Sequence, residues 1–242
     1  MKLEYLKKMD KIIRDAGTRK PDEVLSYMGF IYMDPGESLP GFIMKQKQIV
    51  YYGVNKKLPE KKYAFASFHE AFHGICGHLN LADFVRQGAH ADTFENHRML
   101  AWTEREANIG AADTLIETER FLEMSGYDSE DVKAYTKSLE AFEKAVENYQ
   151  NHYHIVLNNG SSEKRIRRMQ DYQEKLARLY EELREQADDI MNAGYCLSRP
   201  EMAAALEVPE FVIDYKYEAM AVRNYHVPRV ELPTFDKVFG NW

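Results

Sequence analysis

The chain has 242 residues, of which 45% are hydrophobic and 29% are charged, and its formal net charge is −7. This is the composition of a globular protein with enough apolar material for a core, and its acidic balance argues against a broad nucleic-acid surface, which needs a basic face. With only two cysteines, Cys76 and Cys196, the sequence excludes a disulfide framework. It contains no apolar signal core and no run of membrane length, so we expect a cytoplasmic protein in a reducing compartment that contacts no membrane.

The first part of the chain is predicted to combine two short helices with three strands. An amphipathic pattern over residues 2–16 ends at Gly17, and Asp22 can cap a second helix that reaches about Met28. Three strand-like runs follow, separated by turn residues, and we expect them to form a small antiparallel sheet. These runs are Gly29–Met33, Gly41–Lys45 and Gln48–Val54.

Two longer helices are predicted next. Pro59 stands where the first would begin, and Gly77 ends it after residues 60–76. The second covers about residues 99–124 and is broken by Gly126. The residues with the clearest chemical potential lie on these two helices.

The first of these helices carries a His-Glu-x-x-His motif, His69-Glu70-Ala71-Phe72-His73. Residues four apart on a helix lie on one face, about 40° apart in azimuth, so His69 and His73 can bind one Zn²⁺. Glu70 is offset to the side of that face, where it can reach an activated water without binding the metal. The motif therefore predicts zinc on His69 and His73, with Glu70 as the general base.

A catalytic zinc also needs a third protein ligand and an open fourth position. The second helix carries a stripe of residues at helical spacing whose small alanines would let another helix approach closely. Glu104 begins this stripe, whereas Glu106 lies nearly opposite, on the side of Asp113. Helical periodicity therefore selects Glu104 over Glu106 as the third ligand. The stripe consists of Glu104, Ala107, Asn108, Ala111 and Leu115.

Taken together, these residues resemble the ImmA/IrrE family of metallopeptidases. The resemblance implies a zincin-like fold with zinc on His69, His73 and Glu104, and with Glu70 as the catalytic residue. It also implies a protein substrate, namely a repressor-type transcription regulator of a phage or another mobile element. The matching segments are the zinc motif, Glu104–Asn108, Ala111–Leu115, the stretch Leu39–Tyr63 before the motif and Glu201–Met220 near the end.

The chain departs from the family pattern at three places. The family usually has Leu-Gly between the Glu and the second His, where this chain has Ala71-Phe72. It usually has Phe-Ala-Ala where this chain has Gly110-Ala111-Ala112. A further His often follows the second ligand by one turn in the family; here that position is Gly77, and His78 comes one residue later.

Four further residues near the motif are candidates for a role. Cys76 follows the motif helix's ligand face and is either a ligand or, more simply, a small core residue. His78, His90 and His97 lie between the two helices, and one of them is a candidate for stabilising an oxyanion, although surface histidines are more common. The sequence leaves open whether Cys76 or His78 contacts the metal.

Residues 128–192 show two heptad patterns joined by a polar turn, which predicts a long antiparallel coiled-coil hairpin. Its apolar positions run from Val132 to Val156 and from Met169 to Ile190. The hairpin is either a structural arm or a surface for a partner or a homodimer. The basic run Lys164–Arg168 near its tip is either a solvated helix start or a contact for acidic partners.

The last segment predicts two short helices, Glu201–Leu206 and Phe211–Val222, followed by an irregular tail from residue 226. The pair has helix-turn-helix shape. Its second helix carries Asp214 and Glu218 but few basic residues, so a packing or protein-docking role fits better than DNA binding.

The sequence therefore predicts a mostly helical α+β fold. A zincin-like core (1–127) carries a coiled-coil hairpin (128–194) and a C-terminal segment (195–242) that packs on the core. The expected function is that of a zinc-dependent endopeptidase that cleaves an intracellular regulator. The alternative is a non-catalytic zinc-containing interaction protein that binds a regulator through the hairpin and the C-terminal helices. A DNA-binding regulator fits the acidic charge least, and we expect no direct contact with nucleic acid.

Overall fold

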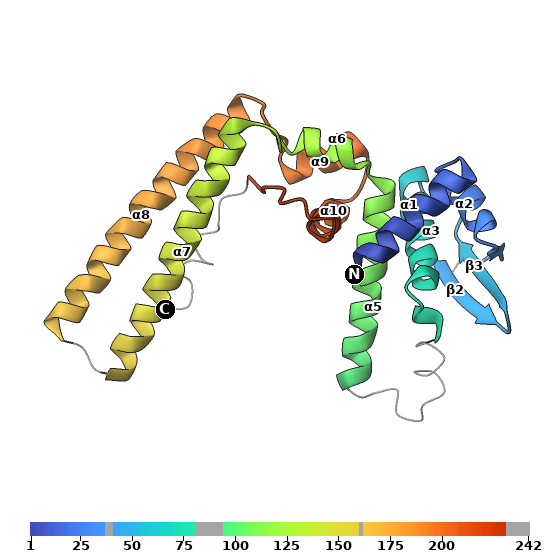
Figure 1. Cartoon of the computed structure of the whole chain (residues 1–242), viewed down its shortest axis with the longest axis horizontal. Coiled ribbons are helices and arrows are strands. Elements are labelled where there is room, and N and C mark those ends of the chain that lie inside the picture. Colours follow the sequence, from blue (N-terminus) through green and yellow to red (C-terminus); the bar gives the residue numbers. More distant parts are fainter. Residues whose placement is uncertain (37–40, 81–93, 160–161, 231–242) are drawn as a thin grey trace. The chain divides into compact units, whose positions relative to one another are not determined.

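The computed structural model describes residues 1–36, 41–80, 94–159 and 162–230, with the backbone alone at 94–99 and 157–159. The fold is mostly helical with one small sheet, as the α+β prediction expects (Figure 1). The chain divides into two compact units. The first consists of Met1–Arg120 with Arg199–His226, and the second of Phe121–Ser198 with the described part of Val227–Trp242.

The first unit begins with two short helices, α1 (Leu3–Ala16) and α2 (Pro21–Tyr27). Helix α1 ends at Gly17, which adopts a left-handed conformation (φ 67°) and donates its backbone N–H to carbonyls of the last turn. Pro21 occupies the first turn of α2, where no backbone N–H is needed. Both helices therefore lie where the sequence predicts them, but the predicted cap is wrong, because α2 begins at Pro21 and Asp22 lies in its first turn.

The sheet consists of β1 (Ile31–Tyr32), β2 (Gly41–Gln46) and β3 (Ile49–Val54), in the order β1-β3-β2. Strands β2 and β3 pair antiparallel, as predicted, from Gly41 opposite Val54 to Gln46 opposite Ile49. The prediction is wrong for β1, which pairs parallel with β3, so the sheet is mixed. A tight turn joins β2 directly to β3 and makes them antiparallel neighbours, and β1 lies along the other edge of β3.

Helices α3 (Glu60–Ile75) and α5 (Phe94–Leu115) pack side by side in the first unit (Figure 1). Their contact is close because small residues line it: Ala107 and Ala111 are fully buried. At Gly110 a Cβ atom would lie 2.3 Å from the ring of Phe72, so the glycine makes room for that ring. The glycine and the alanines therefore bring the two motif helices together.

The second predicted motif helix, at about 99–124, is in fact two helices. Helix α5 ends at Leu115, and α6 (Thr118–Met124) follows after a short break. Near the chain's end, α9 (Arg199–Leu206) and α10 (Glu210–Val222) belong to the first unit, and α10 packs on α5. Residues 226–230 have no regular structure, while the rest of the predicted tail lies outside the described residues.

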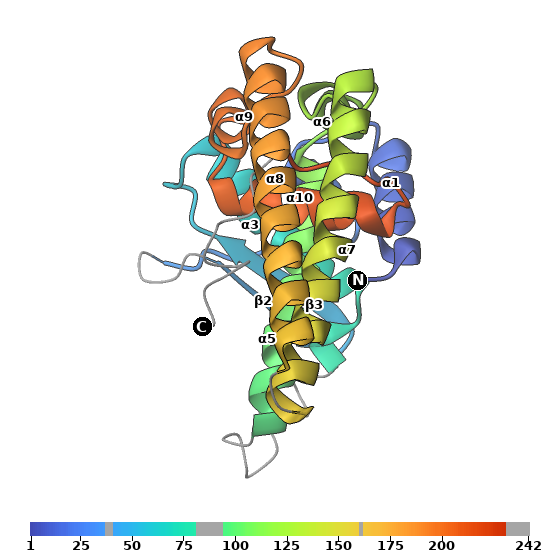
Figure 2. The same cartoon turned by 90° about the vertical axis from the view of Figure 1, so that its left-hand side faces the viewer.

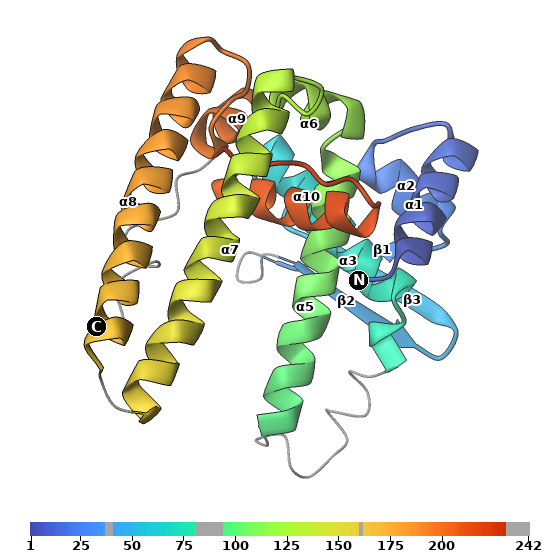
Figure 3. The same cartoon turned by 60° about the vertical axis from the view of Figure 1, so that its left-hand side comes forward.

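The second unit is dominated by two helices of 30 residues each, α7 (Glu130–Asn159) and α8 (Glu163–Asn192). Figure 2 and Figure 3 show them side by side, and we call them the helix pair. The predicted heptad positions supply their shared core, including the buried residues Val132, Tyr135, Phe142, Tyr149, Leu176, Leu183 and Ile190. None of the helices in the described ranges is both long enough and apolar enough to cross a membrane.

Candidate metal centre

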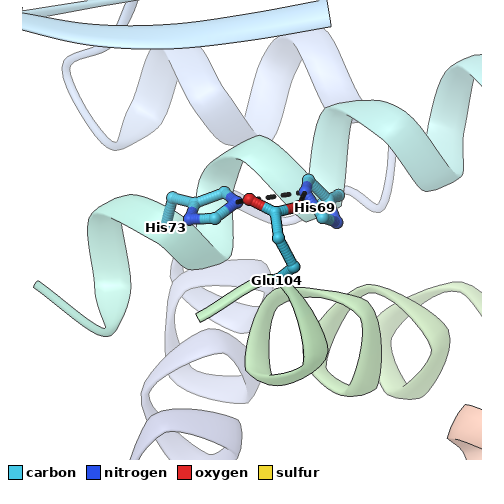
Figure 4. Close-up of side chains that lie close together, drawn as sticks. All are labelled: His69, His73 and Glu104. Atoms are coloured by element: carbon cyan, nitrogen blue, oxygen red, sulfur yellow. Dashed lines mark hydrogen bonds and ion pairs between the residues drawn. The ribbon is translucent and has the colours of Figure 1, made fainter. Parts of the chain in front are cut away.

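The three predicted ligands come together between α3 and α5 (Figure 4). His69 and His73 project from α3 with their Nε2 atoms 3.0 Å apart. Glu104 reaches them from α5, with Oε2 3.1 Å from Nε2 of His69 and Oε1 3.4 Å from Nε2 of His73. Both imidazoles are mostly buried, whereas the Glu104 side chain is half-exposed.

These separations suit one small metal ion. Zinc binds imidazole and carboxylate at about 2.0–2.2 Å with tetrahedral geometry, which places neighbouring ligand atoms roughly 3.3 Å apart. The three observed distances, from 3.0 to 3.4 Å, lie around that value. One ion can therefore touch all three side chains with little movement of either helix.

Asn108 determines which ring nitrogen of His69 carries the proton. Nδ1 of His69 lies 2.8 Å from Oδ1 of Asn108, one turn beyond Glu104 on α5. Because an amide oxygen only accepts, Nδ1 must donate. In the neutral ring Nε2 then carries a lone pair that faces the Glu104 carboxylate, another acceptor. Two acceptors at this distance repel each other unless a proton or a cation lies between them. A metal ion bound by both atoms would remove this repulsion.

The close contact of these side chains also shifts the pKa values of Glu104 and His69. Where the His69 and His73 rings carry a proton on Nε2, their hydrogen bonds to Glu104 hold its pKa far below the usual range, so this carboxylate is ionised. Burial lowers the pKa of His69, but the hydrogen bond with Glu104 and the charges of Glu70 and Glu104 outweigh burial and raise it. In the absence of a metal, a proton is thus drawn to the place that a cation would take.

Glu70 lies beside this cluster and against strand β2. A Cβ atom on Gly41 would lie 3.1 Å from Oε1 of Glu70, so the glycine leaves space for the carboxylate. Burial raises the pKa of Glu70, and the positive charges of His69 and His73 oppose that rise. Within the described ranges its carboxylate has no hydrogen-bond or ion-pair partner. A buried carboxylate with a raised pKa is suited to accept and return a proton.

A second group lies behind His73 and contains His78, Glu106 and Cys76. Nδ1 of His78 is 3.1 Å from Nδ1 of His73, and Nε2 of His78 is 3.1 Å from Oε2 of Glu106. His78 therefore contacts the ring of His73 on the side away from Glu104. Burial lowers the pKa of His78 and raises the pKa of the Cys76 thiol to about 12. Cys76 belongs to this second group and not to the ligand cluster.

Two residues in this region were not assigned a role by the sequence. Asn108 appears in the predicted stripe only as a member of the face, although its position four residues after Glu104 is a usable signal. Glu106 is set aside as a ligand, yet it is almost completely buried behind His73. Of the other predicted candidates, His90 lies outside the described residues, and only the backbone of His97 is described.

Comparisons of the chain with protein-family models, with curated proteins and with solved structures found no match. The geometry of this cluster and the motif that builds it are therefore what indicates a function.

Proposed function

We propose that this protein is a zinc-dependent endopeptidase in which His69, His73 and Glu104 hold the metal and Glu70 is the catalytic base. The observation that carries the proposal is the convergence of three side chains whose nitrogen and oxygen atoms lie 3.0 to 3.4 Å apart, distances suited to zinc. Among the described residues no fourth side chain joins this group. A three-ligand site with an open position is the arrangement of catalytic zinc.

The chain's own residues can then perform peptide hydrolysis. Zinc bound at this site supplies Lewis-acid activation of water and of a carbonyl group. The Glu70 carboxylate accepts a proton from the attacking water and returns it to the nitrogen of the leaving amine, so it begins and ends ionised. Asn108 holds the His69 ring in the required tautomer through its 2.8 Å hydrogen bond.

We extend the proposal to membership of the ImmA/IrrE-like peptidases with a zincin-like core, because two departures from the family motif compensate each other. The chain has Phe72 where the family has Gly, and Gly110 where the family has Phe. In the structure the Phe72 ring occupies the space over Gly110. Exchanging large and small residues across one contact preserves its volume, so the helices keep the distance that the shared ligand site requires.

The remaining parts of the proposal concern the substrate and its capture. The family resemblance supports a repressor-type transcription regulator as substrate, cleaved in the cytoplasm. The helix pair, with its heptad core, is proposed to be an antiparallel coiled coil that binds this regulator or a second copy of the chain. A purely structural, non-catalytic zinc site would need a closing ligand such as Cys76, but Cys76 groups with His78 and Glu106 instead.

The proposal is tested with zinc-loaded protein and a peptide mixture prepared from a proteome. After incubation, new amino termini are identified by mass spectrometry for the wild type, for Glu70→Gln and for Glu60→Gln. Glu60 is the matched control, because it lies on the same helix and is exposed. We expect the wild type and Glu60→Gln to produce a common set of new amino termini. Glu70→Gln should produce these termini at a rate about 10²–10⁴-fold lower.

Metal content is measured on the same three samples. We expect about one zinc per chain in each, because Glu70 is not a ligand. Equal cleavage by the wild type and Glu70→Gln would refute the catalytic role. Absence of bound zinc in the wild type would refute the metal centre itself.

A further inference from the structure

Two buried side chains behind His73 have no part in the proposed chemistry. His78 and Glu106 are exposed by 4% and 2%, and they contact each other 3.1 Å apart. Such groups are costly to bury unless they are hydrogen-bonded. His78 is also in contact with His73, so the pair is linked directly to the ligand cluster.

The protons in this chain of contacts can be placed one by one. The Glu106 carboxylate only accepts, so Nε2 of His78 carries a proton and donates it. Nδ1 of the neutral His78 ring then has a lone pair, which accepts the Nδ1 proton of His73. His73 is left with its lone pair on Nε2, the atom that faces Glu104 and His69. The contacts select the tautomer that a metal needs.

The backbone brings these residues to the right place. Gly77 adopts a left-handed conformation (φ 78°), which ends α3 and turns the chain so that His78, five residues after His73, lies against its ring. Glu106 comes from α5, two residues after Glu104. The same helix thus offers one carboxylate to the front of His73 and another, through His78, to its back.

We infer that His78 and Glu106 are positioning residues that fix the tautomer and the ring orientation of His73 for metal binding. The inference rests on the proposed zinc centre. Outer hydrogen-bond partners of metal-binding histidines commonly change metal affinity by about 10–100-fold when they are removed. Asn108 has the equivalent position for His69.

The first test measures zinc affinity by chelator competition on purified full chain. We expect His78→Ala to bind zinc about 10–100-fold more weakly than the wild type. His78→Asn should recover most of this loss, because its amide oxygen can accept the Nδ1 proton of His73. His154→Ala is the matched control, since His154 is exposed on α7 and should leave affinity unchanged.

A double-mutant cycle then asks whether Glu106 acts through His78. Glu106→Gln alone should weaken zinc binding less than His78→Ala, because the amide oxygen still accepts a hydrogen bond from His78. The substitution also removes the ion pair between Oε1 of Glu106 and the N-terminal ammonium of Met1, 2.6 Å apart, so its cost to folding is measured separately. In the His78→Ala background, Glu106→Gln should cause little further loss, since the link to His73 is already broken. Independent, multiplying losses would show two separate structural effects and would overturn the inference.

A spectroscopic readout separates positioning from general destabilisation. In zinc-loaded protein with ¹⁵N-labelled histidine, the hydrogen-bonded Nδ1 proton of His73 should give a slowly exchanging NMR signal. We expect this signal in the wild type and in His78→Asn, and its loss by exchange in His78→Ala. Thermal unfolding of the metal-free variants shows whether each one is folded.

The outcomes distinguish this inference from the proposed function. If the wild type binds zinc and folded His78→Ala binds it equally tightly, the positioning role is wrong while the centre stands. If the wild type binds no zinc, both are wrong. Two zinc ions in the wild type but one in Cys76→Ser would assign His78 and Glu106 to an ion of their own, and would also overturn the positioning role.

Discussion

Helix α5 contributes to two clusters of charged side chains that differ in one respect. Near its end, the Asp113 carboxylate is met by Lys216 at 2.9 Å and by Nε of Arg223 at 3.0 Å, both from the C-terminal segment. Nearer its start, Glu104 meets His69 and His73 from α3. Every acceptor of the first cluster has a donor that carries a proton. In the second, three side chains turn acceptor atoms toward one another.

Because of this difference, we interpret the Asp113 cluster as structural and the His69–His73–Glu104 cluster as the proposed metal site. Lys216 is completely buried and Asp113 almost so, and their opposite charges satisfy each other without a ligand. The His69–His73–Glu104 cluster is satisfied only by a proton or a cation. Substitutions in the first cluster should therefore change folding stability and not zinc binding, while those in the second should do the reverse.

The largest effect is expected at Lys216. Lys216→Met leaves the buried Asp113 charge with Arg223 alone and should lower the free energy of unfolding by about 3–5 kcal/mol, the usual cost of breaking a buried pair. Arg105→Met is the control, because Arg105 joins the same two helices through Glu218 in an exposed pair, where about 0–1 kcal/mol is expected. Denaturant unfolding of metal-free protein measures both. Equal losses would mean that burial does not distinguish the pairs.

The reciprocal change is Glu104→Ala. Removing a metal ligand should weaken zinc binding by more than the roughly 100-fold that losing an outer partner costs. Because the Glu104 side chain is 55% exposed, the stability of the metal-free protein should hardly change. Chelator competition and unfolding of the same samples provide the comparison. A variant that loses stability but keeps zinc would reverse the assignment of the two clusters.

The pH dependence of stability provides a third test. Burial raises the pKa of Asp113, but Lys216 and Arg223 outweigh burial and hold this pKa below its unfolded value of about 3.9. The stabilisation is thus present above the unfolded pKa and is lost as pH falls through the folded pKa. Unfolding free energy of the metal-free protein should decline in acid, and Asp113→Asn should show a shallower decline. An unchanged slope would contradict the pairing.

The smallest effect is expected at Gly41. Gly41→Ala places a methyl group 3.1 Å from Oε1 of Glu70 and should shift this carboxylate slightly. Since a misplacement of about 1 Å can cost up to about 100-fold, we expect a smaller loss of cleavage rate, with zinc affinity unchanged. Rates on a peptide identified as a substrate measure this. Weaker zinc binding in Gly41→Ala would mean that β2 supports the ligands and not the base.

Much of the fold and of the candidate site follows from spacing within single helices. The i, i+4 relation places His69 and His73 on one face, and helical phase turns Glu104 toward the same side as Asn108. The heptad pattern likewise predicts the buried positions of the helix pair. Each of these features depends on the spacing of residues within a single helix, so the sequence of that helix is enough to predict it.

Contacts between distant segments could not be obtained in this way. Nothing local states that β1 pairs parallel with β3, or that Lys216 reaches Asp113 across 103 residues. The break between α5 and α6 also escaped the periodic pattern, because apolar spacing continues across it.

By itself, the sequence determined which residues can share a helix face, and thereby the identities of the three proposed ligands and of the base. Only the tertiary structure decided which residues contact these side chains. Asn108 contacts His69, His78 contacts His73 and is itself bonded to Glu106, and Gly110 makes room for the ring of Phe72. The physical reason is that helical spacing fixes the direction of a side chain, whereas its partner depends on which helices pack together and how closely.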